Sequence, residues 1–367
     1  MNFELLKKLC ETASIPSREE QMRAVVVEEM DSLTDSISID TMGNVIGIKR
    51  GKGGPRVMIA AHIDEIGFIV KHIDDKGFIR IHPMGSWDPR TMVAQRVYVH
   101  GFSGQTLLGA LMPASKPIHL MSAEDHKKAP KIAQFFVDVG LPADKVNELV
   151  EVGDMVTMAR SAEQVGNMVM SKAIDNRVSV FVMLEVLRTV KEHECDILAV
   201  ATAQEEVGLR GATTAAFSLE PDIGIAIDTT LAVDYPGSTK QDEITSLGNG
   251  VAIKIIDSSL ICHPKLVRHF RDVAKEHDIS HQLEILPFGR TDAGGIQRSR
   301  HGVPSITLSI PTRYIHTVNE MAAVSDIEAT ISLLARYLEE AHTRHYGYEQ
   351  DLLPDTHKMM SVLLTAS

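Results

Sequence analysis

Amphipathic stretches and short apolar runs alternate along most of this chain. Residues 3–13 place their large apolar side chains on one face, which predicts a helix, and the same spacing predicts another over 18–33. The second stretch follows Ser17 and Glu20, whose spacing is typical of a capping box. Residues 56–61 form a compact apolar run, which predicts a buried strand.

The same alternation resumes after residue 170. Further strands are expected at 36–40, 44–48, 196–203, 222–227, 252–256, 282–286 and 303–310, and further helices after Asp175, over 265–277 and after a second capping-box pattern at 325–328. Strands that alternate with helices favour an α/β fold with a mixed, mainly parallel sheet sandwiched by helices.

Between these two regions the pattern changes to period two, interrupted by Gly, Pro and Ser. We therefore expect a small β-rich domain at 70–165, with one short helix near 143–149, inserted into a discontinuous catalytic domain made of 1–69 and 166–345. The insert contains no complete set of catalytic residues, so its expected role is association with other copies or control of access to the active site. Residues 346–367 show weak periodicity and are left unassigned.

Composition narrows the class of protein. A chain of 367 residues favours two domains, and its net charge of -12 argues against nucleic acid as the main partner. We find no apolar run of the roughly 20 residues that a membrane span needs, and the first residues do not resemble a signal peptide. Cys10, Cys195 and Cys262 form no paired motif, so we expect buried thiols and a cytoplasmic location.

The candidate chemistry lies where the predicted strands end. Glu205 and Glu206 follow the apolar run 196–203, and two adjacent carboxylates at such a place are costly unless they are paired or coordinated. Similar junctions hold other potential ligands, namely His62 with Asp64, Asp175, Asp228 and His316. In open α/β sheets ligands bind outside the carboxyl ends of the strands, so these side chains are expected to converge.

Each candidate has a simpler interpretation when taken alone. His62 could be a loop histidine beside a solvated Asp64, Asp175 a helix N-cap, Asp228 a turn residue and His316 a core histidine. Together, two histidines and three carboxylates supply what two divalent cations need, with one carboxylate bridging and one glutamate left as a general base. Oxygen and nitrogen ligands without thiolate suit zinc, cobalt or manganese. A carboxylate two residues after a histidine can also accept its second ring N–H.

Five ordered motifs carry a family resemblance over about residues 3–343. They are residues 61–67 (AHIDEIG), 172–177 (KAIDNR), 204–208 (QEEVG), 226–228 (AID) and 313–316 (RYIH), joined by 289–293 (GRTDA) and, in the insert, 116–119 (KPIH). The chain resembles the tetrahedral, glutamyl-aminopeptidase-like di-metal aminopeptidases, which are cytosolic metalloproteases. Its sequence differs slightly from the usual family motifs at Arg290 and at 317–319, which leaves substrate preference open.

The resemblance implies a role for each residue. Asp175 would bridge two metal ions, His62 and Asp228 would complete one ion, and Glu206 and His316 the other. Glu205 would be the general base acting on a metal-bridging water, and Asp64 would orient His62. The family's inserted domain makes dimer contacts, and dimers are commonly joined into tetrahedral dodecamers, so a homo-oligomer is expected.

The expected function is metal-dependent release of N-terminal amino acids from peptides with a free N-terminus. The nearest alternative is a di-metal deacylase or carboxy-end dipeptidase, in which Arg177, Arg290 or Arg313 grips a substrate carboxylate. A glycoside hydrolase with paired carboxylates is more remote, because its acids must face each other about 5–9.5 Å apart and the histidines go unexplained. A non-enzymatic scaffold is the last alternative.

Overall fold

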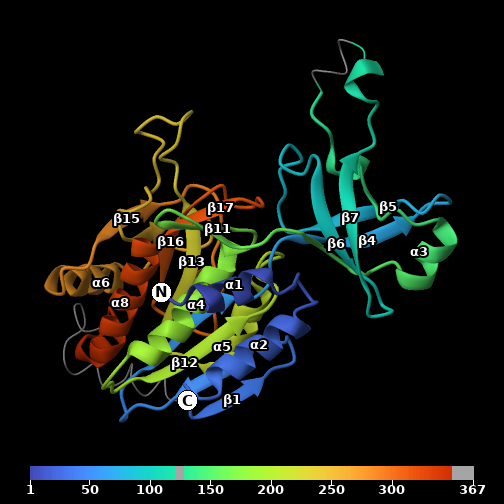
Figure 1. The fold of residues 1–367 in the computed structure, drawn as a ribbon. Helices are drawn as coiled ribbons and strands as arrows, with labels where there is room; N and C mark the ends of the chain where they lie inside the picture. Colours follow the sequence, from blue (N-terminus) through green and yellow to red (C-terminus); the bar gives the residue numbers. More distant parts are fainter. Residues whose placement is uncertain (121, 123–127, 349–367) are drawn as a thin grey trace.

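The computed structural model describes residues 1–120, 122 and 128–348, and they form a large helix-covered sheet with a closed β-barrel beside it (Figure 1). The sheet is 11-stranded within the described residues, in the order β1-β2-β12-β3-β13-β16-β17-β11-β10, and β16 also pairs with β14, which pairs with β15. The strands are β1 (Ser36–Ile39), β2 (Val45–Lys49), β3 (Arg56–His62), β10 (Glu163–Val165), β11 (Met168–Ser171), β12 (Asp196–Thr202), β13 (Ile223–Leu231), β14 (Val251–Ile256), β15 (His281–Ile285), β16 (Ser305–Arg313) and β17 (Glu320–Ala323).

The predicted mixed sheet is confirmed, and its parallel part is the centre. Strands β12, β3, β13 and β16 pair in parallel, as do β14 and β15, whereas the remaining pairings of the sheet are antiparallel. Because parallel strands all end at the same edge, the central four bring their carboxyl ends together. That edge is where the predicted site residues lie.

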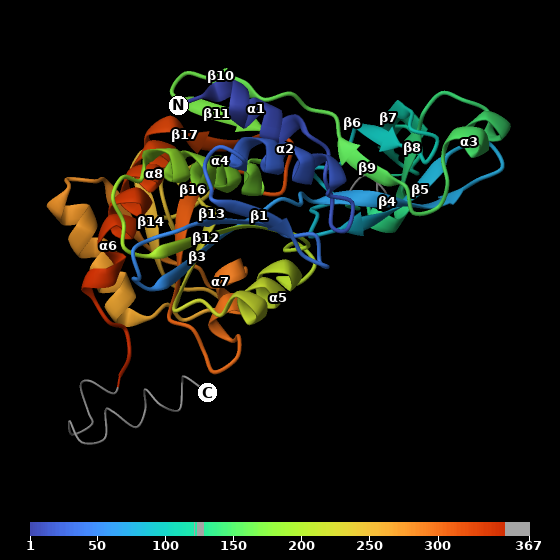
Figure 2. The ribbon, with the colours of Figure 1, turned by 90° about the horizontal axis from the view of Figure 1, so that it is seen from below.

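Helices cover both faces of the sheet (Figure 2). One face packs against α1 (Phe3–Glu11), α2 (Glu20–Met30), α4 (Ile174–Thr189), α6 (Pro264–Glu276) and α8 (Val324–Glu340), and the other against α5 (Arg210–Leu219) and α7 (Asp292–Gln297). Short 3₁₀ helices are η1 (Ile118–Leu120), η3 (Ile132–Gln134) and η4 (Ala341–Thr343). None of the helices in the described part of the chain could cross a membrane.

Strand β3 shows how one short sequence serves both layers. Val57, Ile59 and Ala61 enter the core below α4, whereas Met58 and Ala60 enter the core below α5. Successive side chains of a strand point to opposite faces, so a strand that is covered on both sides must be apolar throughout. This explains why residues 57–61 are a continuous apolar run rather than an alternating one.

The barrel is built from antiparallel strands in the closed order β4-β5-β8-β7-β6-β9. These are β4 (Gly67–Ile73), β5 (Ile79–Met84), β6 (Gln95–His100), β7 (Thr106–Pro113), β8 (Phe135–Asp138) and β9 (Met155–Met158), with α3 (Ala143–Leu149) outside. Alternate residues such as Phe68, Val70, Val97 and Val99 fill its interior. The period-two pattern of the sequence reflects this alternation of interior and exterior side chains.

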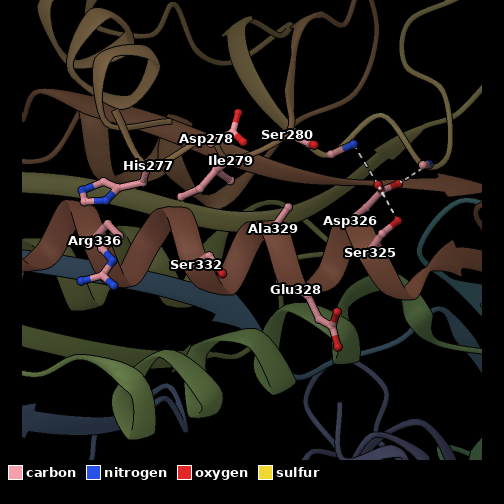
Figure 3. A pocket seen from close by; sticks show the side chains of 12 residues that line it. His277, Asp278, Ile279, Ser280, Ser325, Asp326, Glu328, Ala329, Ser332 and Arg336 are labelled. Atoms are coloured by element: carbon pink, nitrogen blue, oxygen red, sulfur yellow. Dashed lines mark hydrogen bonds between the residues drawn. The ribbon is translucent and has the colours of Figure 1, made fainter. Parts of the chain in front are cut away.

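Both predicted capping boxes are wrong. Helix α2 begins at Glu20 after Glu19, which makes no side-chain cap, and Ser17 has a left-handed φ of 66°. Helix α8 begins at Val324, ahead of the predicted start, and the buried Asp326 carboxylate instead accepts hydrogen bonds from the N–H groups of Gly248 and Gly250 (Figure 3). At this second site the predicted local capping is therefore replaced by contacts with residues distant in the sequence.

The three cysteines are buried and unpaired, as the sequence predicted. Burial raises the pKa of the Cys10, Cys195 and Cys262 thiols to about 12. Because the thiolate is the reactive form, burial disfavours the reactive state of these side chains at neutral pH.

Candidate metal centre

The central strands place the predicted site residues around one cavity of about 680 Å³. Strand β3 ends with His62, which lies directly opposite Thr202 at the end of β12. Their carboxyl ends therefore lie level at the sheet's edge. The cavity is lined by the side chains that the sequence singled out as ligands or base: His62, Asp175, Glu205, Glu206, Asp228 and His316.

Asp228 and the glutamate pair reach the cavity in ways that the sequence did not predict. Asp228 lies inside β13, whose pairing with β3 stops at Ala226, so one edge of the strand is open at Asp228. Glu205 and Glu206 lie beyond the end of β12, after Gln204 with a left-handed φ of 58°. The turn at Gln204 therefore directs the two glutamates.

Asp175 lies between the two histidines. Its Oδ1 is 3.4 Å from Nε2 of His62, and its Oδ2 is 3.4 Å from Nε2 of His316. Its φ of -73° and ψ of 105° are extended, as at an N-cap, but its Oδ1 makes no hydrogen bond and faces His62 instead of capping the helix. His316 is not a core histidine either, because its side chain is 30% exposed and its φ is 63°. One carboxylate thus presents a different oxygen to each imidazole.

The other acids distribute around the same imidazoles. Nε2 of His62 lies 3.8 Å from Glu205 Oε2 and 3.9 Å from Asp228 Oδ1. Nε2 of His316 lies 3.4 Å from Glu206 Oε1. Ligand atoms of His62, Asp175 and Glu206 also lie within 4.8 Å of one another, so the two halves of the site adjoin.

Asp64 is fully buried behind His62 and performs two tasks. Nδ1 of His62 lies 3.0 Å from the main-chain oxygen of Asp64 and 3.5 Å from its carboxylate. The carboxylate accepts hydrogen bonds from the N–H groups of Glu205 at 3.0 Å and Glu206 at 3.1 Å. Asp64 therefore positions the glutamate pair by its side chain and contacts the imidazole most closely by its backbone.

Two buried acids near the site were not anticipated as site residues. Glu320, 1% exposed, accepts hydrogen bonds from the N–H groups of Asp175 and His316. Asp292 begins α7 and accepts a hydrogen bond from the Thr202 hydroxyl, while its Oδ1 makes no hydrogen bond. Only the family motif at 289–293 drew attention to Asp292, and no spacing distinguished Glu320.

The electrostatics reflect acids and imidazoles crowded together away from water. Burial opposes protonation of His62, yet the charge of Glu205 and the contact with Asp175 outweigh burial and raise its pKa well above the ordinary value. Burial, together with the neighbouring acids, raises the pKa of Glu205 and of Asp228 well above the ordinary range. Burial would also raise the pKa of Asp175, but the two histidines hold it well below its ordinary range. Divalent cations would replace the protons that these groups otherwise share.

The residues present fit a divalent metal. Oδ1 of Asp175 is buried and makes no hydrogen bond, although it points at an imidazole nitrogen. Carboxylate oxygens and imidazole nitrogens meet in this cavity, and the three cysteines are free and buried within the cores. This donor set suits zinc, cobalt or manganese rather than copper(I) or an iron–sulfur cluster.

The three arginines considered as carboxylate grips are in different situations. Arg177 is fully buried, and its guanidinium donates hydrogen bonds to three main-chain oxygens within residues 9–14. Arg313 is held by Asp234 through contacts of 2.6 and 2.7 Å. Arg290 is exposed and lines the site cavity. Among these three, Arg290 has the position to meet a substrate.

Comparison with known proteins shows the family of the chain. The family model of the M42 glutamyl aminopeptidases matches residues 43–333. The chain is similar to a lysyl aminopeptidase of Pyrococcus furiosus, with 35% identity over 350 residues that cover 93% of this chain and 97% of the relative.

Solved structures extend the similarity to the fold. An aminopeptidase from the archaeon Desulfurococcus kamchatkensis is 40% identical, with a TM-score of 0.89, and the match covers 92% of this chain and 94% of that one. The TET1 peptidase of Pyrococcus horikoshii, which can assemble into a tetrahedron or a large octahedral shell, is 28% identical with a TM-score of 0.82, covering 92% and 99%. The chain therefore belongs to the M42 glutamyl aminopeptidase family and is an aminopeptidase, a hydrolase of the metallopeptidase class.

Proposed function

We propose that this aminopeptidase works with two divalent metal ions held on either side of Asp175. Asp175 would bridge them, His62 and Asp228 would hold one, and Glu206 and His316 the other. The observation that carries the proposal is the placement of the two Asp175 oxygens, each 3.4 Å from a different imidazole. Zinc or cobalt fits the donor set best, and manganese is also compatible.

Glu205 is proposed as the general base. It lies beside the bridging region, 3.8 Å from Nε2 of His62, and does not contact His316 among the ion pairs of the described chain. Two bound ions supply a water of lowered pKa and positive charge for the substrate's carbonyl oxygen and free amine. Glu205 takes the proton of the attacking water and passes it to the leaving amine nitrogen. The carboxylate of Asp64 holds Glu205 in place by accepting a hydrogen bond from the main-chain N–H of Glu205.

The rest of the cavity would receive the N-terminal residue of a peptide. Leu231, Leu286, Phe288 and Ile315 line it, and Phe288 is 84% exposed. These apolar side chains offer contact area to the substrate, while Arg290 adds a positive charge. The proposed substrate is therefore a peptide with a free N-terminus whose first side chain meets this wall.

A di-metal deacylase or dipeptidase that grips a carboxylate through Arg290 is the second candidate. The decisive experiment compares a free-amine aminoacyl chromogen with its N-acylated counterpart, using protein stripped by chelator and reloaded with zinc, cobalt or manganese. The proposal predicts cleavage of the free-amine substrate, loss of activity on chelation and recovery on reloading. Cleavage of the blocked substrate alone would establish the second candidate instead.

The barrel and the solution state form the remaining part of the proposal. We propose that the barrel, which runs from β4 to β9 and corresponds to the region predicted at 70–165, is an inserted domain for association and access, and that the chain forms a cytoplasmic homo-oligomer of dimers or a tetrahedral dodecamer. The exposed Tyr98, Leu108 and Met112 on β6 and β7 support an association surface, because Tyr98 and Leu108 lie opposite each other on adjacent strands. Mass by light scattering tests this proposal.

A further inference from the structure

Strand β17 lies between β11 and β16, the two strands that precede the proposed metal ligands Asp175 and His316. It pairs with β16, which leads to His316, and with β11, which leads to Asp175. Its first residue, Glu320, lies directly opposite Ser171. Glu320 is therefore placed where one side chain can reach both segments.

The Glu320 carboxylate uses a different oxygen for each segment. Its Oε2 accepts a hydrogen bond from the N–H of Asp175 at 2.9 Å, and its Oε1 accepts one from the N–H of His316 at 2.8 Å. Hydrogen bonds from N–H to a carboxylate are among the stronger kind, and burial of Glu320 strengthens them further. The side chain thus ties together the backbones of two residues whose own side chains meet at 3.4 Å.

Both segments have conformations that need such support. His316 and Tyr314 have left-handed φ angles of 63° and 61°, and Ala173 has a φ of 57°. Non-glycine residues adopt this region at a cost and persist there when surrounding contacts hold them. A hydrogen bond to the N–H of His316 itself acts directly on one of these positions.

We propose that Glu320 is a positioning residue, which fixes the distance between Asp175 and His316 so that their side chains meet at the metal position. The inference rests on the proposed ligand roles of those two residues. Glu320 touches neither substrate nor reacting atoms in this assignment and acts through the two ligands. Residues of this kind typically change metal affinity 10–100-fold when altered.

The test measures metal affinity rather than turnover alone. In Glu320→Gln one oxygen becomes an NH₂ group that faces a main-chain N–H, so one of the two hydrogen bonds is lost. We expect zinc affinity, measured by competition with a chromogenic chelator, to fall about 10–100-fold. The visible spectrum of the cobalt-loaded variant should shift, and added zinc should restore part of the aminopeptidase activity.

Asp326→Asn is the matched control. Asp326 is also fully buried and also accepts main-chain N–H groups with both oxygens, from Gly248 and Gly250, but it lies in a different pocket (Figure 3). This variant should lower Tm while leaving zinc affinity within about twofold of wild type. If Glu320→Gln does not fold, Glu320→Asp replaces it, since it keeps the charge but is too short to reach both N–H groups.

The outcomes separate the two proposals. A wild-type protein that cleaves the free-amine substrate and binds zinc, beside a Glu320 variant with unchanged affinity and cobalt spectrum, overturns the positioning role alone. Equal loss of affinity in the Asp326 control also overturns it, because general destabilisation would then explain the result. A wild-type protein that binds no stoichiometric metal overturns the proposed function and this inference with it.

Discussion

At the residue scale, two adjacent glutamates face different partners in the same cavity. Glu205 reaches towards His62, at 3.8 Å, while Glu206 reaches towards His316, at 3.4 Å. Asp64 accepts the main-chain N–H of both, so the backbone of the pair is fixed while the side chains diverge. Chemically identical residues can therefore take separate roles, one as proton carrier and one as ligand.

The assignment of the base predicts that Glu205→Gln separates metal binding from turnover. The amide has nearly the same shape but cannot accept the proton of the attacking water, so kcat should fall by about 10²–10⁴-fold. Metal content by elemental analysis should equal that of wild type, because Glu205 is not assigned as a ligand. A variant that keeps substantial turnover, or that loses a metal ion, would show that the roles of the two glutamates are different from those proposed.

Arg290 carries the second prediction at this scale. Because it is exposed at the cavity, its charge should favour substrates with a carboxylate by only about 0.2–1 kcal/mol, or up to about fivefold. Arg290→Gln should lower kcat/KM for acidic aminoacyl substrates relative to leucyl ones, and the difference should shrink with salt. Arg290→Lys, which keeps the charge, is the control. An unchanged substrate ratio in Arg290→Gln would remove Arg290 from specificity.

Most of the candidate ligands could be singled out from the sequence because they lie at or just beyond the end of a predicted strand, whereas Asp175 was singled out at the start of a predicted helix. The structure brings His62, Asp175, Glu205, Asp228 and His316 to one cavity, although their roles remain proposals. Glu320 could not be found in this way. Its position depends on the pairing of Ser171 with Glu320, which are far apart in the chain. The local spacing of residues does not indicate such a pairing.

At the element scale, the barrel reaches into the site through the end of β5. Gly85, with a φ of 82°, follows this strand, and a Cβ there would lie 2.4 Å from the Ile66 side chain and 3.2 Å from Oε2 of Glu206. Neighbouring Ser86 lines the cavity itself. The barrel is therefore in contact with one side of the proposed metal centre.

This contact predicts that Gly85→Ala disturbs metal binding. The added methyl group would press on Ile66 and Glu206, so zinc affinity and kcat/KM should both fall by about an order of magnitude, the lower end of effects on groups that support ligands. Gly104→Ala is the matched control, since Gly104 has a φ of 81° with nothing within 4 Å of its Cβ position. Both variants should lose about 1 kcal/mol of stability from backbone strain. Equal zinc affinity in the two variants would contradict the prediction.

Most strands and long helices could be predicted because their hydrophobic periods match their burial, but α7 could not. Its six residues include Gly294 and Gly295, which disfavour helix formation. A Cβ at Gly294 would lie 2.3 Å from Oγ of Ser259, and one at Gly295 would lie 2.7 Å from Oγ1 of Thr213. The helix therefore forms where close packing, rather than intrinsic propensity, decides the conformation.

At the scale of the whole molecule, the sequence predicted a sheet domain and a β-rich region but not the closed barrel. Closure requires β4 to pair with β9, as in Phe68 opposite Val156. The interior-exterior alternation of an open sheet and of a barrel is the same, so a period-two pattern cannot distinguish them.

Stability of the whole chain should depend on metal and pH together. Without metal, the raised pKa values of Glu205, Asp228, His62 and His316 mean that the folded state binds protons more tightly than the unfolded state. This contribution is complete at low pH and is lost as pH rises through the raised pKa values. Asp175 acts in the opposite direction, but only at and below its ordinary range near 4.

Divalent ions compete with protons for the proposed ligands His62, Asp228 and His316, so the stabilisation by metal should be small at pH 5 and larger at pH 8. At 100 times its dissociation constant, a bound ion contributes about 2.7 kcal/mol, and protonation of the ligands at pH 5 reduces that value by weakening the apparent affinity. Thermal unfolding with zinc and with chelator at both pH values measures the difference. An increment in Tm that is independent of pH would mean that the ions do not displace protons from this cluster, and hence that they bind somewhere else in the fold.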